Sequence, residues 1–171
     1  MNRNERLFLK KEALKLPKNC IVVEIGSWTG GSSEVFAQAI SNKNGMIYCI
    51  DTWDYRKDKC DPILFQKAQG RNILKEFIKR MKPYNHRALI GKNEQFLNQF
   101  EDGSVDLVFI DADHTYAGAK ADVENWLPKV KPGGVLCGHD YGRDEYGVTQ
   151  AVHEIFGTVE NPARSMWKVK I

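Results

Sequence analysis

The chain has 171 residues, of which 42% are hydrophobic and 27% are charged, and its formal net charge is +3. This length fits one compact domain with a single core, and the apolar fraction excludes a disordered chain. No apolar run approaches the roughly 18 residues that a membrane span needs, and residues 1–17 lack the apolar stretch of a secretory signal. We therefore expect a single domain over residues 1–171 and no membrane partner.

Short apolar runs alternate with helical periodicity along the chain. The opening stretch, residues 4–16, predicts a helix that Pro17 stops, within an N-terminal segment 1–18. Strand-like runs then occupy residues 20–25, 46–50, 87–90, 105–110 and 135–137, and helical stripes occupy residues 35–40, 73–81, 116–130 and 148–156. This order predicts a doubly wound α/β fold, in which a parallel sheet carries helices on both faces.

The last segment, residues 166–171, has a different pattern. Trp167, Val169 and Ile171 share one face, and two lysines take the other. Strict alternation is typical of a half-exposed antiparallel strand. We therefore expect an antiparallel strand added late to the sheet.

The four cysteines are widely spaced and include no C-x-x-C pair. Three of them (Cys20, Cys49 and Cys137) lie in strand-like runs, where a reduced cysteine behaves as a small hydrophobe. This pattern favours the reducing environment of the cytoplasm.

A glycine-containing loop, E-I-G-S-W-T-G-G-S-S at 24–33, follows the first predicted strand. Ligands of open parallel sheets bind at the carboxyl ends of the strands, where glycines allow close backbone approach. Trp28 stands where the dinucleotide motif needs glycine, so no pyrophosphate turn is present. Glu24 suits a ligand with an amino group. Asp51, which ends the second predicted strand, suits ribose hydroxyls. The structural alternatives are an ordinary βα turn and a helix cap.

Two further clusters follow the fourth and fifth predicted strands, D-A-D-H at 111–114 and G-H-D-Y at 138–141. Asp111 and Asp140 could supply the oxygen ligands that hard cations prefer. His114 could accept a hydroxyl proton near neutral pH, with Asp113 as the alternative base or as the group that orients His114. The pattern favours a divalent-metal site beside a base, although these groups could instead cap helices or bond loop backbone.

These motifs, with K-P-G-G-V at 131–135 and the terminal W-K-V-K-I, resemble those of class I S-adenosylmethionine-dependent methyltransferases. The resemblance covers residues 19–171. Within this class the chain is most similar to small bacterial O-methyltransferases grouped with macrolide-sugar and aminocoumarin-sugar enzymes. The resemblance implies a mostly parallel, seven-stranded sheet whose last strand is antiparallel.

The resemblance also implies roles for particular residues. Glu24 and the loop would hold the methionine end of S-adenosylmethionine, Asp51 the ribose, and Trp53 and Asn93 would lie around the adenine. The whole cofactor-binding set is Glu24, Gly26, Ser27, Thr29, Gly30, Ser32, Asp51, Thr52, Trp53, Asn93 and Asp111.

Metal-dependent relatives place ligands at the positions of Asp111, His139 and Asp140, and a catalytic base, lysine or histidine, at that of His114. Those relatives have an acid where this chain has His139. Imidazole is a poorer ligand for Mg²⁺ than for Fe²⁺ or Zn²⁺. Three alternatives are therefore open for the expected Mg²⁺ or Mn²⁺: another ion binds, His139 does not coordinate the ion, or no metal binds.

The predicted reaction is methylation of a hydroxyl on a small molecule or sugar. The alternatives are a non-catalytic S-adenosylmethionine-binding subunit and an oxidoreductase that uses a nucleotide cofactor. We expect no nucleic-acid partner, because the chain lacks the N-P-P-Y and D-P-P-Y motifs of many amino-directed nucleic-acid methyltransferases. The basic stretch 56–92 alone is weak evidence for such a partner. Only residues 52–66 and 141–147, besides the N-terminal segment, are left to shape an acceptor pocket. Because so few residues are available to form this pocket, we expect an open site, or a site that a partner subunit covers in a homo-oligomer.

Overall fold

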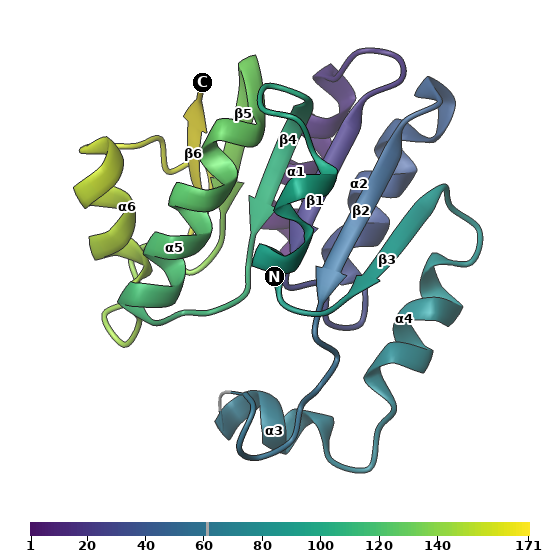
Figure 1. The fold of residues 1–171 in the computed structure, drawn as a ribbon, viewed down its shortest axis with the longest axis vertical. Helices are drawn as coiled ribbons and strands as arrows, with labels where there is room; N and C mark the ends of the chain where they lie inside the picture. Colours follow the sequence, from purple (N-terminus) through teal and green to yellow (C-terminus); the bar gives the residue numbers. More distant parts are fainter. Residues whose placement is uncertain (61) are drawn as a thin grey trace.

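The computed structural model describes residues 1–60 and 62–171. These residues form one sheet with the strand order β3-β2-β1-β4-β5-β6 (Figure 1). The strands are β1 (Ile21–Ile25), β2 (Met46–Asp51), β3 (His86–Ile90), β4 (Val105–Ile110), β5 (Val130–Gly138) and β6 (Trp167–Lys170). All neighbours pair in parallel except β6, which is antiparallel to β5. The predicted α/β fold and its antiparallel last strand are confirmed.

The strand count is the point at which the expectation is wrong. The residues that the structure describes form six strands, and not the seven that the family resemblance implied. After β5 the chain forms α6 (Val148–Phe156) and then enters β6. The segment between them contains Gly157 and Pro162, which disfavour a regular strand. It contributes one isolated bridge, in which Glu160 and Lys168 exchange backbone hydrogen bonds.

Helices cover both faces of the sheet. In Figure 1, α5 (Tyr116–Trp126) and α6 lie in front of the sheet, and α1 (Arg3–Lys15) and α2 (Gly31–Ile40) lie behind it. Phe77 and Met81 of α4 (Ile73–Met81) belong to the same core as α1 and α2. Successive strand residues point to opposite faces, so Val22 packs into one core and Val23 into the other. Burial on both faces explains why these runs are almost continuously apolar.

The predicted helices are present. The opening helix and the four helical stripes correspond to α1, α2, α4, α5 and α6. The predicted loop 52–66 differs, because α3 (Pro62–Ala68) begins within it; Asp61, also in that range, lies outside the described residues. Short 3-10 helices add η1 (Ser41–Lys43), η2 (Asn93–Gln99) and η3 (Leu127–Lys129). No helix in the described ranges has the length and apolar character that crossing a membrane requires.

The sheet fixes where the functional loops begin. Gly26 donates its N–H to Ile50 O, Asp111 to Ile25 O, and His139 to Ile110 O, at 2.8–3.0 Å. The hydrogen bonds therefore continue one residue beyond β1, β4 and β5. As a result, the loops that follow these three strands start side by side at one edge of the sheet.

Candidate active site

The glycine loop touches the end of β4 at Gly26. This residue has a φ of +88°, and a Cβ placed on it would clash with the backbone carbonyl of Asp111. Gly30 also has a positive φ, and a Cβ there would lie 3.0 Å from the ring of Phe77. Glycine is required at position 26 because the loop backbone lies directly against the backbone that follows β4.

Asp51 holds the loop after β1 and the loop after β2 together. Its Oδ2 accepts the N–H of Trp28 at 2.8 Å, and its Oδ1 accepts the N–H of Trp53 at 2.7 Å. The Trp53 indole donates to Trp28 O at 2.8 Å. Both tryptophans have a positive φ, +48° and +46°. Such backbone costs about 1–3 kcal/mol per residue and persists where the surroundings impose it, typically at functional sites.

Tyr55 is a further partner of Asp51, and no sequence motif pointed to it. The Tyr55 hydroxyl donates to Asp51 Oδ2 at 2.7 Å, and its ring meets that of Trp28 edge-on with the centroids 4.3 Å apart. Burial raises the pKa of Asp51, although the hydrogen bonds from Tyr55, Trp53 and Trp28 oppose this effect. A ribose hydroxyl that bound Asp51 would compete with the Tyr55 phenol for the same carboxylate oxygen.

Glu24 lies beneath the glycine loop and is fully buried. The hydroxyl of Ser33 donates to its Oε2, while Oε1 has no hydrogen-bond partner among the described residues. Burial raises the pKa of Glu24 to about 7, against the hydroxyls of Ser32 and Ser33, which lower it. Of the other predicted loop residues, Ser27 is buried and Thr29 half-buried.

The raised pKa of Glu24 predicts a pH-dependent stability. Because the folded pKa of about 7 exceeds the ordinary 4.5, the stabilising contribution is complete below pH 4.5 and is lost as the pH rises through 7. The wild-type free energy of unfolding should carry a loss of up to about 3 kcal/mol over this window. Glu24→Gln should remove that loss. Urea unfolding of both proteins at several pH values measures it, and equal pH slopes would contradict the prediction.

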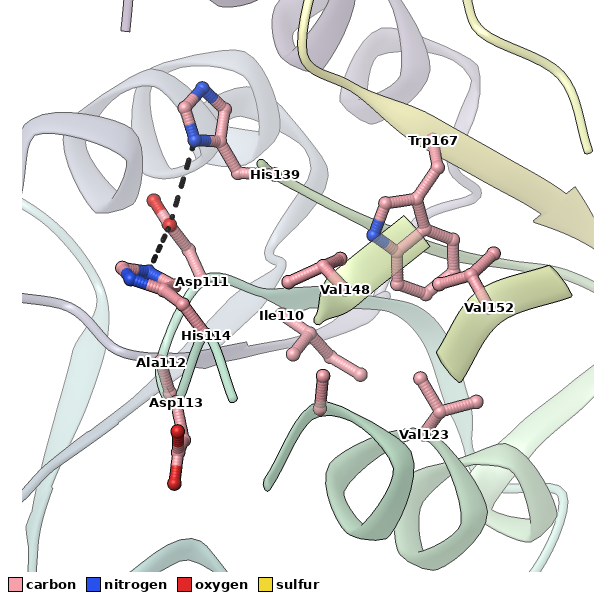
Figure 2. A pocket seen from close by; sticks show the side chains of 11 residues that line it. Ile110, Asp111, Ala112, Asp113, His114, Val123, His139, Val148, Val152 and Trp167 are labelled. Atoms are coloured by element: carbon pink, nitrogen blue, oxygen red, sulfur yellow. Dashed lines mark ion pairs between the residues drawn. The ribbon is translucent and has the colours of Figure 1, made fainter. Parts of the chain in front are cut away.

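Four of the predicted residues, Asp111, His114, His139 and Asp140, meet beyond β4 and β5. Figure 2 shows Asp111 between the two histidines. His114 Nε2 lies 3.0 Å from Asp140 Oδ2 and 3.8 Å from Asp111 Oδ1. His139 Nδ1 lies 3.2 Å from Asp140 Oδ1 and 3.7 Å from Asp111 Oδ1. Asp140 also has a positive φ of +60°. The structure thus brings these four residues into one cluster, which we call the acid–histidine cluster.

Three members of this cluster could hold a metal ion. Asp111, His139 and Asp140 each offer one ligand atom, and these atoms lie within 4.8 Å of one another. Two donors that each stand about 2.1 Å from an ion are at most about 4.2 Å apart, so small side-chain rotations would close the group. Two carboxylates and one imidazole are ordinary metal ligands, and these residues therefore fit a divalent cation.

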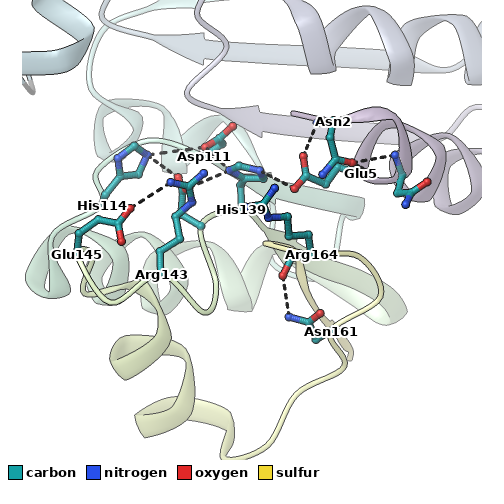
Figure 3. A network of polar contacts seen from close by, with 11 residues as sticks. Asn2, Glu5, Asp111, His114, His139, Arg143, Glu145, Asn161 and Arg164 are labelled. Atoms are coloured by element: carbon teal, nitrogen blue, oxygen red, sulfur yellow. Dashed lines mark hydrogen bonds and ion pairs between the residues drawn. The ribbon is translucent and has the colours of Figure 1, made fainter.

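Two charged residues extend the acid–histidine cluster, Glu5 and Arg143 (Figure 3). Arg143 Nε lies 3.0 Å from Asp140 Oδ1, and Glu5 Oε1 lies 3.5 Å from His139 Nε2. Neither residue was predicted from the sequence. Arg143 falls inside the predicted loop 141–147. Glu5 stands three residues after Asn2, a spacing that indicates a helix start and not a site.

Opposite charges stabilise each other within the cluster. Burial raises the pKa of Asp140, but contacts with His139, His114 and Arg143 outweigh burial and leave this pKa lowered. Burial lowers the pKa of His139, but Asp140, Asp111 and Glu5 outweigh it and leave this pKa raised. The contacts therefore favour the charged forms of both Asp140 and His139.

The remaining predicted residues have local partners. Asp113 Oδ1 accepts the N–H of Thr115 at 2.9 Å, so this side chain turns toward the start of α5, while Asp140 contacts His114. Thr52 is exposed, and its hydroxyl accepts the N–H of Asp54.

Asn93 is held by α5. Its side chain donates to Asp122 Oδ1 at 2.7 Å and accepts the Trp126 indole N–H at 2.9 Å. Asn93 stands just before Glu94-Gln-Phe-Leu97, a position that predicts the N-cap of a short helix. In the structure Asn93 is instead the first residue of η2, and Lys92 occupies the cap. The contacts with α5 explain this shift, because they use both polar atoms of the side chain.

The cavity below the cluster is small. Its volume is about 10 Å³, and its walls include Ile110, Val148 and Trp167 (Figure 2). Such a space holds about one water molecule. A ligand larger than a water molecule must therefore approach the cluster from its solvent side.

A family model described as a methyltransferase domain matches residues 23–141. The chain belongs to this family. The match runs from β1 to the residue after Asp140, and so spans the glycine loop, Asp51 and the acid–histidine cluster. The resemblance to S-adenosylmethionine-dependent methyltransferases is confirmed in family and fold.

This methyltransferase domain also resembles individual proteins. It is 31% identical over 130 residues to the uncharacterized protein y4gI of Sinorhizobium fredii, a match that covers 74% of the chain but 14% of that protein. CalS11, a TDP-rhamnose 3'-O-methyltransferase, has a TM-score of 0.64 at 15% identity, covering 97% of this chain and 76% of its own. An O-methyltransferase from Bacillus cereus in complex with SAH has a TM-score of 0.64 at 17% identity, covering 100% and 82%. These structures show the fold.

Proposed function

We propose that this domain transfers a methyl group from S-adenosylmethionine to a hydroxyl of a small molecule, such as a sugar. The observation that carries this proposal is the single sheet edge at which the glycine loop and Asp51 adjoin the acid–histidine cluster. Membership of the methyltransferase family supports methyl transfer. The described activities of CalS11 and of the Bacillus cereus enzyme support oxygen as the acceptor atom.

The chain's own residues would position the methyl donor. Asp51 would accept hydrogen bonds from the ribose hydroxyls once Tyr55 withdraws, and the backbone of Trp28 and Trp53 already fixes that carboxylate. The unpartnered Oε1 of Glu24 beneath the glycine loop offers a buried acceptor for a polar group of the methionine end, directly or through water. Fixing the donor in line with the acceptor is chiefly a positioning contribution to the rate.

His114 would be the general base. The acceptor oxygen forms its bond to the methyl carbon as the carbon–sulfur bond breaks, and the hydroxyl proton passes to His114. The Asp140 carboxylate, 3.0 Å from His114, would stabilise the imidazolium that forms. A divalent cation such as Mg²⁺ or Mn²⁺, held by Asp111, His139 and Asp140, would stabilise developing charge on the acceptor oxygen.

Calorimetry with S-adenosylhomocysteine tests the proposed function. The wild-type domain should bind it, and Asp51→Asn should weaken binding about tenfold to hundredfold, because a charged hydrogen-bond acceptor is lost. Asp54→Asn is the matched control, since Asp54 lies in the same loop and pairs with Arg56. Absence of binding by the wild-type protein, together with binding of a nicotinamide cofactor, would favour an oxidoreductase. Binding without methylation of any hydroxyl compound would favour a non-catalytic subunit.

The proposal also covers the cellular location and the oligomeric state of the protein. We infer a cytoplasmic protein from its free cysteines, of which Cys20, Cys49 and Cys137 are buried. We also infer a homo-oligomer in which a neighbouring subunit covers the acceptor side of the cluster. Gel filtration at the mass of one chain would contradict the second inference.

A further inference from the structure

Glu5 connects the first helix to the acid–histidine cluster. It lies in the first turn of α1 and is 3% exposed. Its carboxylate oxygens have different partners: Oε2 accepts the N–H of Asn2 at 2.6 Å, and Oε1 lies 3.5 Å from His139 Nε2 (Figure 3). A glutamine would complete the capping box equally well. Burying a charged carboxylate against His139 therefore calls for a role beyond the helix cap.

His139 presents its two ring nitrogens to different neighbours. Nε2 faces Glu5, while Nδ1 faces Asp140 and Asp111. Nε2 is buried and makes no hydrogen bond among the described residues, so the Glu5 carboxylate 3.5 Å away is a facing charge and not yet a bonded partner. Because a carboxylate only accepts hydrogen bonds, this placement favours the tautomer with the hydrogen on Nε2. In a neutral imidazole the lone pair then belongs to the other nitrogen. That nitrogen is Nδ1, on the side where the two aspartates converge.

We propose that Glu5 positions His139 as a nitrogen ligand, so that the site formed with Asp111 and Asp140 prefers an ion such as Co²⁺, Fe²⁺ or Zn²⁺ to Mg²⁺. Imidazole suits these transition metals, whereas Mg²⁺ requires oxygen ligands. A carboxylate that holds the second nitrogen of a histidine ligand fixes both its tautomer and its ring orientation. The inference rests on the proposed function, because it concerns the same site. Glu5 is a positioning residue, since it contacts His139 and not the acceptor.

Glutamine at position 5 separates the two roles of Glu5. Its amide oxygen can still accept the Asn2 N–H, and its NH₂ group then faces His139 Nε2. Because an amide NH₂ donates, Nε2 must accept, and the imidazole hydrogen moves to Nδ1, where it blocks coordination. If the glutamine amide flipped, its NH₂ group would face the Asn2 N–H. Two hydrogen-bond donors would then oppose each other, and the helix cap would be lost. Glu5→Gln should therefore impair metal binding while α1 stays folded.

Titration of the full chain with Co²⁺ and Mg²⁺, each alone, tests this inference. The visible spectrum of bound Co²⁺ reports nitrogen ligation, and calorimetry gives both affinities. We expect the wild type to bind Co²⁺ at least about tenfold more tightly than Mg²⁺. Glu5→Gln should lose about 10–100-fold in Co²⁺ affinity with an unchanged thermal midpoint. His139→Asp should move the preference toward Mg²⁺ and abolish the nitrogen signature.

Two control variants separate the metal role from helix stability. Glu12 is a second buried glutamate of α1 and pairs with Lys15 and Lys168, so Glu12→Gln should bind Co²⁺ as the wild type does. Asn2→Ala weakens the cap but keeps the Glu5 carboxylate, and should do the same. Wild-type Co²⁺ affinity in Glu5→Gln, equal losses in the controls, or no preference for Co²⁺ would each overturn the inference. Calorimetry with S-adenosylhomocysteine on the same samples judges the proposed function separately.

Discussion

Replacing Gly26 with alanine should destabilise the domain by about 3–5 kcal/mol and eliminate S-adenosylhomocysteine binding. Two effects add. A φ of +88° is unfavourable for any residue with a Cβ, and the added methyl group would clash with the carbonyl of Asp111. To relieve this clash, either the glycine loop or the end of β4 must move. A shift of the end of β4 would also displace Asp111, which belongs to the acid–histidine cluster. Urea unfolding and calorimetry measure the two losses.

Gly133 provides the matched control for this substitution. It has a φ of +82°, but a Cβ there would meet nothing within 4 Å. Gly133→Ala should therefore cost only the backbone contribution, about 1–2 kcal/mol, and leave ligand binding intact. If the two variants lose equal stability, the close approach of the loop to β4 is not what requires glycine at position 26.

Replacing His114 with glutamine should lower kcat about 10²–10⁴-fold with any acceptor that the wild type methylates, while S-adenosylhomocysteine affinity stays within about twofold. Glutamine can still donate to Asp140 but cannot take a proton. The rise in rate with pH that a general base produces should also disappear. Rates measured across the pH range, with S-adenosylhomocysteine calorimetry beside them, test both expectations.

Two further variants test whether the loss of kcat is specific to His114. His153→Gln changes an exposed histidine of α6 that contacts Tyr141, and should leave kcat unchanged. Asp113→Asn removes the alternative base; because Asp113 turns toward Thr115, we expect a small effect. A larger loss of kcat in Asp113→Asn than in His114→Gln would transfer the role of base to Asp113.

The sheet could be predicted because its strands are buried on both faces. The runs that became β1 and β4 are apolar except for Glu24 and Asp106, since neighbouring residues such as Val22 and Val23 enter different buried cores. The missing strand, expected between α6 and β6, was not predicted by any apolar run in the sequence. It came from the family resemblance alone, and in this chain Gly157 and Pro162 occupy the segment where it would have formed.

The site could be predicted only where a strand delivers the residue. Asp51 ends β2, Asp111 directly follows β4, and Asp140 lies two residues beyond β5, so sheet geometry places them at one edge. Tyr55 comes from a loop with no periodicity, and Glu5 comes from α1, which packs on one face of the sheet. The predicted cap at Asn93 was wrong. The polar atoms of Asn93 suited a cap, yet Asp122 and Trp126 of α5 engage them.

The two strained tryptophans give the protein an optical property. The chain has four tryptophans; Trp126 and Trp167 are fully buried in the core, while Trp28 and Trp53 are partly exposed and share Asp51. Emission from the core pair is shielded from solutes, whereas the indoles at Asp51 change surroundings whenever that carboxylate changes partner. Intrinsic fluorescence therefore divides into a constant background and a signal that originates beside Asp51, without any added dye.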